Sequence, residues 1–425
     1  MTRKLCFCAS WLLLLALPHG AQAACSVTQG DFDGNGRPDV RINGDTGKQV
    51  IIIDDSQTSY HVLVDCNGDG DYTDPGDIDT GNLTFDIETF DVQGKGKDIV
   101  IYETMGTYTG ASKNLLVTFG PATAAQPNVV QLANFYAVQG NSSIVVDVFG
   151  SSGPDFVYLF GAQPVDNSSI ILRGDLGAGD DTVYLSPTAM TGSVLTTDFE
   201  LGPGSNTVYV IPSSPIDSST LLTNAVGSSS PGQVDTLNWY GFGPVINGSR
   251  SLTNMSLLAG NDTVKAVLVP GFFQIAASTV ALRVNGGAGN DSFTLNDGNT
   301  GTGIANTGAL DIDFSGGAGN DLATVDWSGP ARGNGTTRFR INGGDGNDIL
   351  FGAINLDSSA SNPNLDFLMQ GGRGNDTLFW SVLDPNGAAT YRSQGASLAD
   401  GGPDADLCIF FGSGVHQSLS CESGS

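Results

Sequence analysis

A short glycine- and aspartate-rich segment recurs along most of the chain at a nearly constant interval. Its clearest copies are GGAGND at Gly286–Asp291 and Gly316–Asp321, GGDGND at Gly343–Asp348 and GGRGND at Gly371–Asp376. Weaker copies end at Asp98, Asp155, Asp181, Asn206, Asp235, Asp262 and Asp406. From Asp155 onward successive copies lie 25 to 30 residues apart, and a degenerate copy is expected near Asn128. A fixed period of this length is typical of solenoid proteins, in which each repeat stacks on the last.

The segments on both sides of each copy alternate between apolar and polar residues. Val183 and Leu185 lie two and four positions after one final aspartate, and Val284 and Leu282 lie two and four positions before one first glycine. Period two indicates strands, since a helix would need a period of 3.6. The prediction is an all-β fold, a parallel β-solenoid (right-handed β-helix) of about eleven coils with capped ends. Two-faced and three-faced coils both remain open.

The two ends of the chain differ from the repeats. Arg3 and Lys4 precede a short apolar run, Trp11–Leu17, so residues 1–23 are predicted to be a signal peptide and the mature protein to be secreted or held at the cell surface. Lipid attachment at Cys25 is the alternative. Residues 24–97 are predicted as an N-terminal cap, 98–406 as the solenoid and 407–425 as a C-terminal cap. No later stretch is apolar for long enough to be a transmembrane segment.

Four cysteines remain after removal of the signal peptide, two near each end of the chain. An oxidising compartment favours disulfides, and a solenoid needs its open ends covered. The expected pairs are therefore Cys25–Cys66 and Cys408–Cys421. The net charge is −27 and becomes more negative when Arg3 and Lys4 are removed. Such acidity argues against nucleic acid and anionic membranes as partners and favours bound cations.

The repeated turn resembles the nonapeptide G-G-x-G-x-D-x-U-x of the RTX, or haemolysin-type, calcium-binding family. The resemblance spans residues 155–406, and it implies calcium as the cofactor. In that family the nonapeptides follow one another directly, whereas this chain has one copy in each coil of about 28 residues. The family's β-roll and its export route are therefore not carried over. The metal-binding residues that the resemblance implies are Asp181, Asp262, Gly286, Gly289, Asp291, Gly316, Gly319, Asp321, Gly343, Gly346, Asp348, Gly371, Gly374 and Asp376.

Calcium suits such a turn for physical reasons. Glycine lets the backbone bend so that carbonyl groups point into the loop, and the aspartate adds a carboxylate to an all-oxygen ligand set. The alternative is a metal-free turn that the aspartate caps by hydrogen bonds. Charge favours the metal, because carboxylates stacked ~4.8 Å apart repel by ~3.5 kcal/mol at an effective dielectric constant of 20, a cost that asparagine avoids.

Two further acidic loops lie in the predicted N-terminal cap. Asp31, Asp33, Asn35 and Asp39 have a spacing similar to the calcium loops of integrin-type propeller repeats. Asp65, Asn67, Asp69 and Asp71 begin a segment similar to the loops of dockerins and thrombospondin type 3 repeats, although Gly76 stands where an EF-hand has glutamate. Both loops are predicted metal sites, with a metal-free hairpin turn as the alternative.

Outward-facing positions carry charged and aromatic columns. The period places Arg283 beside Asp313, Asp313 beside Arg340, Asp311 beside Arg338 and Arg338 beside Asp366, as expected for a surface ion-pair ladder. Tyr158, Tyr184 and Tyr209 should stack on one outer face, where they either bind a sugar polymer or simply cover the strands. A neighbouring threonine column, which is similar to the flat face of ice-binding solenoids, contains Thr182, Thr207, Thr236 and Thr263.

Together these features predict a secreted calcium-binding β-solenoid that serves adhesion, matrix or cell-surface structure. Its expected partner is an extracellular polysaccharide or a cell-surface glycan. The alternative is an extracellular polysaccharide-degrading β-helix enzyme, since solenoid lyases combine acidic calcium ligands with a basic residue on an outer sheet. No catalytic residue is assigned, because His61 and His416 lie far apart in the repeat and no G-x-S-x-G motif is present.

Overall fold

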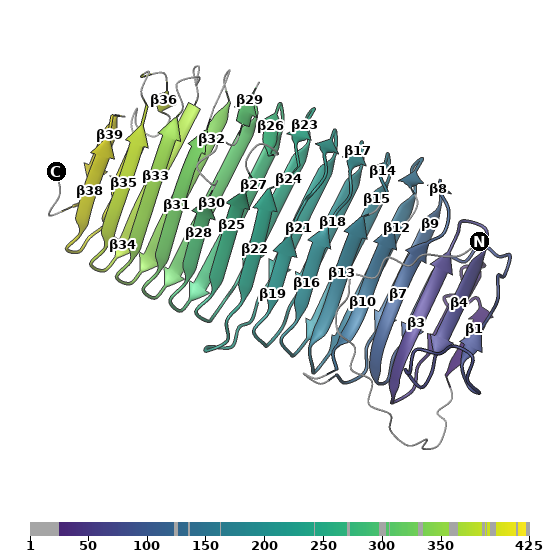
Figure 1. Ribbon diagram of the computed structural model, residues 1–425. Helices are drawn as coiled ribbons and strands as arrows, with labels where there is room; N and C mark the ends of the chain where they lie inside the picture. The colour runs from purple at the N-terminus through teal and green to yellow at the C-terminus, as the bar shows by residue number, and fades with distance from the viewer. Residues whose placement is uncertain are drawn as a thin grey trace.

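The computed structural model describes residues 25–421, apart from 123–125, 135–136, 162, 242, 270–272, 297–302, 306, 330–334, 357–363, 385–386, 388, 392–396 and 414. The predicted signal peptide, residues 1–23, lies outside the described residues. The described chain is a parallel β-solenoid of about ten turns, which confirms the predicted fold class. Figure 1 shows the strands as rungs that follow one another from the N-terminal to the C-terminal end. Within the described part of the chain, no helix has the length and apolar character needed to cross a membrane.

The strands form two long sheets and one short sheet. Sheet A contains β1 (Ser26–Gly30), β2 (Asp39–Asn43), β6 (Thr89–Gln93), β9 (Ser112–Thr118), β12 (Ser143–Ser151), β15 (Ser169–Gly177), β18 (Val194–Glu200), β21 (Thr220–Val226), β24 (Arg250–Ser256), β27 (Thr279–Ala288), β30 (Ala309–Ala318), β32 (Thr336–Asp345), β34 (Asn364–Arg373), β36 (Thr390–Tyr391), β37 (Ser397–Asp400) and β39 (His416–Leu419).

Sheet B contains β3 (Lys48–Asp55), β4 (Tyr60–Asp65), β5 (Ile78–Asp79), β7 (Lys97–Thr104), β10 (Asn128–Asn134), β13 (Asp155–Gly161), β16 (Thr182–Ser186), β19 (Thr207–Val210), β22 (Thr236–Gly241), β25 (Thr263–Leu268), β28 (Ser292–Asn296), β31 (Leu322–Gly329), β33 (Ile349–Leu356), β35 (Thr377–Leu383) and β38 (Leu407–Gly412). Sheet C contains β8 (Tyr108–Thr109), β11 (Val138–Gln139), β14 (Val165–Asp166), β17 (Met190–Thr191), β20 (Ile216–Asp217), β23 (Val245–Ile246), β26 (Gln274–Ala276) and β29 (Gly303–Ala305).

Each central coil visits the three sheets in turn. β15 lies in sheet A, the glycine turn leads to β16 in sheet B, and β17 in sheet C precedes the return to β18 beside β15. The coil is therefore three-faced, which the sequence had left open. Equivalent residues pair in parallel between neighbouring coils, as Val183 does with Val208. The degenerate coil expected near Asn128 is present, because Asn128 pairs in register with Asp155.

The ends of the solenoid differ from the predicted boundaries. The parallel ladder begins inside the segment predicted as the N-terminal cap, since β2 pairs with β6 and β3 pairs with β7. The sheet edges beyond them are covered by antiparallel strands, β1 on sheet A and β4 and β5 on sheet B. At the other end β38 and β39 continue the parallel ladder through the predicted C-terminal cap. Only at the N-terminal end do strands reverse direction and cover the edges of the parallel ladder among the described residues.

Both predicted disulfides are present. Cys25 is bonded to Cys66 and Cys408 to Cys421, with Cα–Cα distances of 6.0 and 5.8 Å. The first links the antiparallel strands of the N-terminal end, and the second closes the last coil. Because the sulfur of Cys25 is part of this bond, it is not free to carry the lipid of the alternative prediction.

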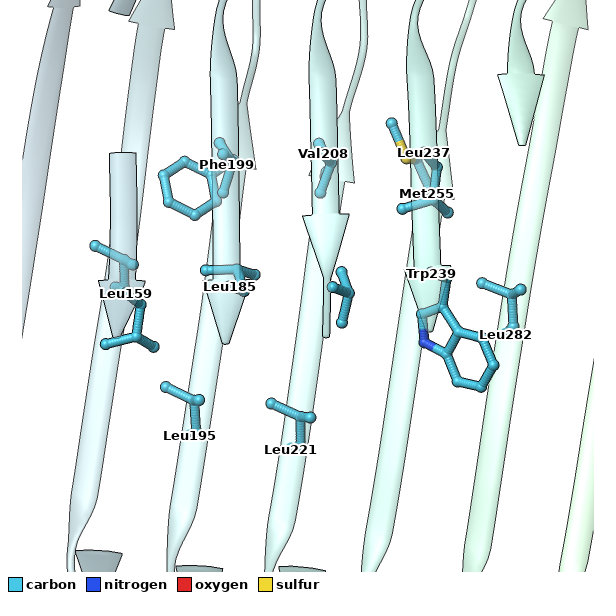
Figure 2. Packing of buried hydrophobic residues seen from close by; sticks show 14 of the residues in the cluster. Leu159, Leu185, Leu195, Phe199, Val208, Leu221, Leu237, Trp239, Met255 and Leu282 are labelled. Atoms are coloured by element: carbon cyan, nitrogen blue, oxygen red, sulfur yellow. The ribbon is translucent and has the colours of Figure 1, made fainter. Parts of the chain in front are cut away.

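The core is a continuous column of apolar side chains between the three sheets. The inward positions predicted on both flanks of the turns are buried, including Val183 and Leu185 after one turn and Leu282 and Val284 before another. Figure 2 shows labelled core residues on successive rungs, among them Leu185 of β16 in sheet B, Leu195 of β18 in sheet A and Trp239 of β22. The alternation of apolar and polar residues therefore explains the core, because each strand buries every second side chain against the neighbouring coils.

A ladder of serines marks the corner between sheets C and A. The residue before each serine has a φ between 46° and 82°. The backbone N–H of each serine except the last, Ser278, donates to the hydroxyl of the serine in the next coil at 3.0–3.2 Å. Its members are Ser142, Ser168, Ser193, Ser219, Ser249 and Ser278. The hydroxyls satisfy buried backbone groups that this sharp corner removes from the strand ladders.

Candidate metal centres

The final residues of the repeated turns form one buried column along the corner between sheets A and B. Each is at most 2% exposed. The column contains Asp98, Asn128, Asp155, Asp181, Asn206, Asp235, Asp262, Asp291, Asp321, Asp348, Asp376 and Asp406. The sequence correctly placed these residues in a single column, although it did not predict that the side chains would be buried.

One oxygen of each carboxylate supports the stacking of the coils. Oδ1 of Asp348 accepts the backbone N–H of Asp321 at 2.7 Å, and Oδ1 of Asp321 accepts that of Asp291 at 2.7 Å. The same bond joins Asp262 to Asp235 and Asp376 to Asp348, at 2.7 and 2.8 Å. Oδ1 therefore accepts the capping hydrogen bond that the metal-free alternative predicts. It accounts for only half of each carboxylate.

Between Asp181 and Asp376, the second oxygen has no hydrogen-bond donor among the described residues in six of these turns. They are Asp181, Asp262, Asp291, Asp321, Asp348 and Asp376. These six are the turn aspartates that the RTX resemblance implied as metal ligands. In two turns without the glycine motif the second oxygen is satisfied: Oδ2 of Asp155 accepts the N–H of Ser151, and Oδ2 of Asp235 accepts that of Ser228, each at 2.6 Å. Asp98 differs, because neither of its oxygens has a donor among the described residues. A buried acceptor without a donor is costly unless a cation or a proton neutralises it.

The first glycine of the motif provides the space that this oxygen occupies. A Cβ at Gly286, Gly316, Gly343 or Gly371 would lie 2.1–2.3 Å from Oδ2 of the aspartate in the same turn. It would also lie 2.4–2.7 Å from the carbonyl oxygen of the first glycine in the next coil. Each of these four turns thus places a carboxylate oxygen and a backbone carbonyl oxygen beside a space that the side chain of any residue other than glycine would fill. An all-oxygen ligand set of this kind fits calcium.

The third glycine of the motif has a different role. Gly289, Gly319, Gly346 and Gly374 have φ values of 121° to 155°, which L side chains rarely adopt. A Cβ on any of them would lie 1.5–1.7 Å from a carbonyl oxygen of the preceding coil. These glycines are required for the close stacking of the turns, whether or not a metal is bound.

Burial raises the pKa of the turn carboxyls, and neighbouring carboxylates raise several of them further. The pKa is raised to about 8 for Asp181, to about 7 for Asp262 and Asp348, and to about 6 for Asp321. Burial likewise raises the pKa of Asp98, which the sequence had not placed among the metal ligands, to about 7. In the absence of a cation, the column would therefore titrate near neutral pH.

Two asparagines in the column show what a turn without charge looks like. Asn206 accepts the N–H of Asp181 with Oδ1 at 3.0 Å, and its Nδ2 donates to the carbonyl oxygens of Gly202 and Gly204 at 3.0 and 3.3 Å. Asn128 likewise donates to the carbonyl of Gly120. Asparagine thus keeps the stacking bond and satisfies the turn. Aspartate in the other coils is not needed for stacking alone.

The first N-terminal loop brings its acidic side chains together. Three carboxylate oxygens, one each from Asp31, Asp33 and Asp39, lie within 4.8 Å of one another. This is the cluster of potential metal ligands found among the described residues. Asp39 is 2% exposed; its Oδ2 accepts the N–H of Phe32, and its Oδ1 has no donor among the described residues. Asn35 donates to Asp33 at 2.8 Å. Hydrogen bonds from backbone N–H groups, first that of Gly36, lower the pKa of Asp31.

The second loop is organised differently. Both oxygens of Asp65 accept backbone N–H groups, from Gly68 at 2.5 Å and Gly70 at 2.7 Å. Asn67, Asp69 and Asp71 each accept an N–H two residues further on, at 2.8–3.0 Å. The structure does not bring these four side chains into a cluster of ligand atoms like that of Asp31, Asp33 and Asp39. The loop is held by its own turns, which is the metal-free arrangement.

The charge ladder lies on the outer face of sheet A with one change in its pairing. Strand register sets Arg283 beside Asp313 as predicted, but the guanidinium reaches Asp311 instead, at 3.5 Å. Arg338 contacts Asp311 at 3.3 Å and Asp366 at 3.1 Å, and Arg340 contacts Asp366 at 3.2 Å. Long guanidinium side chains can reach the diagonal neighbour, so register alone does not fix the partner.

The tyrosine column is the centre of a larger aromatic patch on the outer face of sheet B. Tyr158, Tyr184 and Tyr209 pair in register, with ring centroids 6.0 and 5.6 Å apart. Phe156 and Phe160 extend the patch along β13, at 6.1 and 5.8 Å from Tyr158. The neighbouring threonines, Thr182, Thr207, Thr236 and Thr263, also pair in register as predicted.

Comparison with known proteins adds no assignment to these sites. No protein-family model matches the chain. No curated protein matches it. No solved structure matches it either.

Proposed function

We propose that the mature chain is an extracellular, calcium-stabilised β-solenoid that acts as an adhesion, matrix or cell-surface structural module. One observation carries the proposal: six buried turn aspartates each have an oxygen without a donor among the described residues, while Asp155 and Asp235, in turns without the glycine motif, have the same oxygen satisfied. Calcium, when bound, would supply the positive charge and the oxygen coordination that these turns lack. Disulfides near both ends and a net charge of −27 support the extracellular, cation-binding setting.

The residues that would hold calcium follow from the geometry. In the solenoid they are the six aspartates with a donor-free Oδ2, together with backbone carbonyls of the glycine turns. In the N-terminal end they are Asp31, Asp33 and Asp39, supported by Asn35. We do not extend the proposal to Asp65, because among the described residues its loop does not gather three acidic ligand atoms as Asp31, Asp33 and Asp39 do.

An extracellular polysaccharide or cell-surface glycan is the ligand class that we propose for the outer surface. Five aromatic rings form a patch across three neighbouring rungs, and their faces suit the apolar faces of sugar rings. The alternative, a polysaccharide-degrading enzyme, would need a free base on the outer sheet. Arg338 and Arg340, the central bases of the charge ladder, are instead held by Asp311 and Asp366. Lys265, on the exposed face of β25, is the base that an enzyme assay should examine.

Thermal unfolding of the purified mature protein tests the calcium proposal. We expect chelation with EDTA to lower the melting temperature by many degrees, and excess calcium to restore it where magnesium does not. Each site loaded at about 100 times its dissociation constant adds up to ~2.7 kcal/mol to the free energy of unfolding. Identical melting curves in EDTA and calcium would contradict the proposal. A panel of polysaccharides scored for both binding and turnover separates the module from the enzyme.

A further inference from the structure

A fully buried lysine lies in the core near the N-terminal end of the solenoid. Lys113 on β9 is 1% exposed and faces inward. The equivalent inward position is apolar in the next coils, where Ile144, Ile170, Leu195 and Leu221 follow in register. Burying an ammonium group in place of such a side chain brings little net stability even when it is paired. Stability alone therefore does not explain a lysine at this position, which points to a chemical role.

The amine of Lys113 lies between two carboxylates. Its Nζ is 3.4 Å from Oδ1 of Asp55, the last residue of β3, whose side chain is completely buried. It is 3.1 Å from Oδ1 of Asp86, which is 58% exposed. It also donates to the carbonyl oxygen of Ile87 at 2.7 Å. One carboxylate is thus enclosed with the amine, and the other connects the amine to solvent.

Two buried tyrosines hold Asp55 in place. The hydroxyl of Tyr102 donates to Oδ2 of Asp55 at 2.7 Å, and that of Tyr108 donates to the backbone carbonyl of Asp55 at 3.0 Å. Burial raises the pKa of both phenols, so they remain donors. Burial also raises the pKa of Asp55, which favours the neutral carboxyl that an amine can attack. A donor fixed on the oxygen that gains charge is the arrangement that assists acyl transfer.

We propose that Lys113 and Asp55 form an intramolecular isopeptide bond. Nζ of Lys113, after losing a proton to Asp86, attacks Cγ of Asp55, and the developing charge on Oδ2 is stabilised by Tyr102. The Nζ–Cγ bond forms and the Cγ–Oδ1 bond breaks. Oδ1 leaves as water with the proton of the neutral Asp55 carboxyl and a second proton from the amine, while the first proton that the ammonium lost passes from Asp86 to solvent. The one N–H left on the amide nitrogen can still donate to the Ile87 carbonyl. No oxidant or other reactant is required, and the 3.4 Å contact between Nζ and Oδ1 places the amine beside the carboxyl group that it attacks.

The bond would join sheet A to sheet B across the core. Asp55 and Lys113 are 58 residues apart in sequence and belong to β3 and β9. The disulfide Cys25–Cys66 closes a separate loop at the same end. A solenoid unravels from its ends, where each coil has only one neighbour. A second covalent link would therefore protect the N-terminal end of the solenoid against fraying and proteolysis, independently of calcium.

Mass spectrometry of the reduced, full mature chain tests the proposal. We expect a mass lower than that of the sequence by one water. We also expect trypsin to spare Lys113, giving a branched peptide of residues 49–95 and 98–173. Lys113→Arg should abolish the mass loss, whereas Lys265→Arg, a change on the exposed face of β25, should preserve it.

The proposal does not depend on the folding of the Lys113 variant. Asp86→Asn changes a largely exposed residue, and it should slow bond formation so that uncrosslinked chain accumulates beside crosslinked chain. A wild-type protein that unfolds cooperatively, has the full mass of its sequence and is cut by trypsin after Lys113 would overturn the proposal. In that case Lys113 and Asp55 would form only a buried ion pair.

Discussion

Replacing Asp348 with asparagine should change the free energy of unfolding in opposite directions with and without calcium. Oδ1 of Asp348 accepts the N–H of Asp321, and its Oδ2 has no donor among the described residues. Asn206 fills the equivalent place in an earlier coil, keeps the stacking bond and donates to two turn carbonyls. The Asp348→Asn variant should therefore keep the ladder and replace a donor-free oxygen with a donor.

The expected size follows from the pKa of Asp348. Burial raises it from 3.8 to about 7, so at pH 8 ionising the buried carboxyl costs the folded state ~4 kcal/mol at full strength. We take about half, ~2 kcal/mol, because adjoining turn residues such as Asn347 are exposed to solvent. Without calcium the variant should be more stable than the wild type by ~2 kcal/mol at pH 8. At pH 5 the wild-type carboxyl is protonated in the fold, and the gain should shrink below ~1 kcal/mol.

Calcium should reverse this order. The wild type then gains up to ~2.7 kcal/mol for each loaded site, whereas the variant loses a ligand. Urea unfolding followed by circular dichroism, at pH 8 with EDTA or calcium, measures both differences. Asp235→Asn is a matched control, because Oδ2 of Asp235 already accepts the N–H of Ser228 and its effect should be the same in both buffers. If Asp348→Asn also shifts stability equally with and without calcium, the reasoning is refuted.

Four further predictions concern other parts of the structure. In EDTA, raised carboxyl pKa values mean that the folded state binds protons more tightly than the unfolded one, so melting temperature should fall as pH rises from about 4 to 8, and calcium should flatten the curve. Gly343→Ala places a Cβ 2.1 Å from a carboxylate oxygen and should cost about 2–3 kcal/mol in urea unfolding, whereas Gly47→Ala, with 3.6 Å of space, should cost little. Arg340→Gln should cost less than ~1 kcal/mol by the same assay, because Arg338 still contacts Asp366; a larger loss would mean that the ladder is a structural requirement. Tyr184→Ala should weaken polysaccharide binding at least tenfold in affinity electrophoresis without changing the melting temperature by more than a few degrees; unchanged binding would remove the aromatic patch as the ligand site.

Sheets A and B could be predicted from the sequence because every coil repeats them with period two. Val183 and Leu185 are buried where that period placed them. Sheet C could not, because strands such as Met190–Thr191 are too short to display any period. The serine ladder was hidden for a related reason: loops of variable length separate Ser193 and Ser249 from the glycine turns.

The candidate sites were predictable only in part. The period identified Asp291 and Asp321 as equivalent, but not that one oxygen of each would accept a backbone N–H and the other would have no donor among the described residues. The two N-terminal loops look alike in sequence, and they differ because backbone N–H groups satisfy Asp65 while Asp39 keeps a buried oxygen without one. Lys113 is a charged departure from a mostly apolar column, which also holds Ser251 and Thr337, and a repeat pattern carries no signal for such an exception.

The number of calcium ions that the mature protein retains tests the central claim most directly. Equilibrium dialysis against buffered calcium at pH 8, followed by elemental analysis, gives that number for the wild type and for the double variant Asp321→Asn and Asp348→Asn. We predict more than one ion per wild-type chain and fewer in the double variant, because both changes remove a buried carboxylate oxygen without a donor. A wild-type chain that retains no calcium while fully folded would contradict the account.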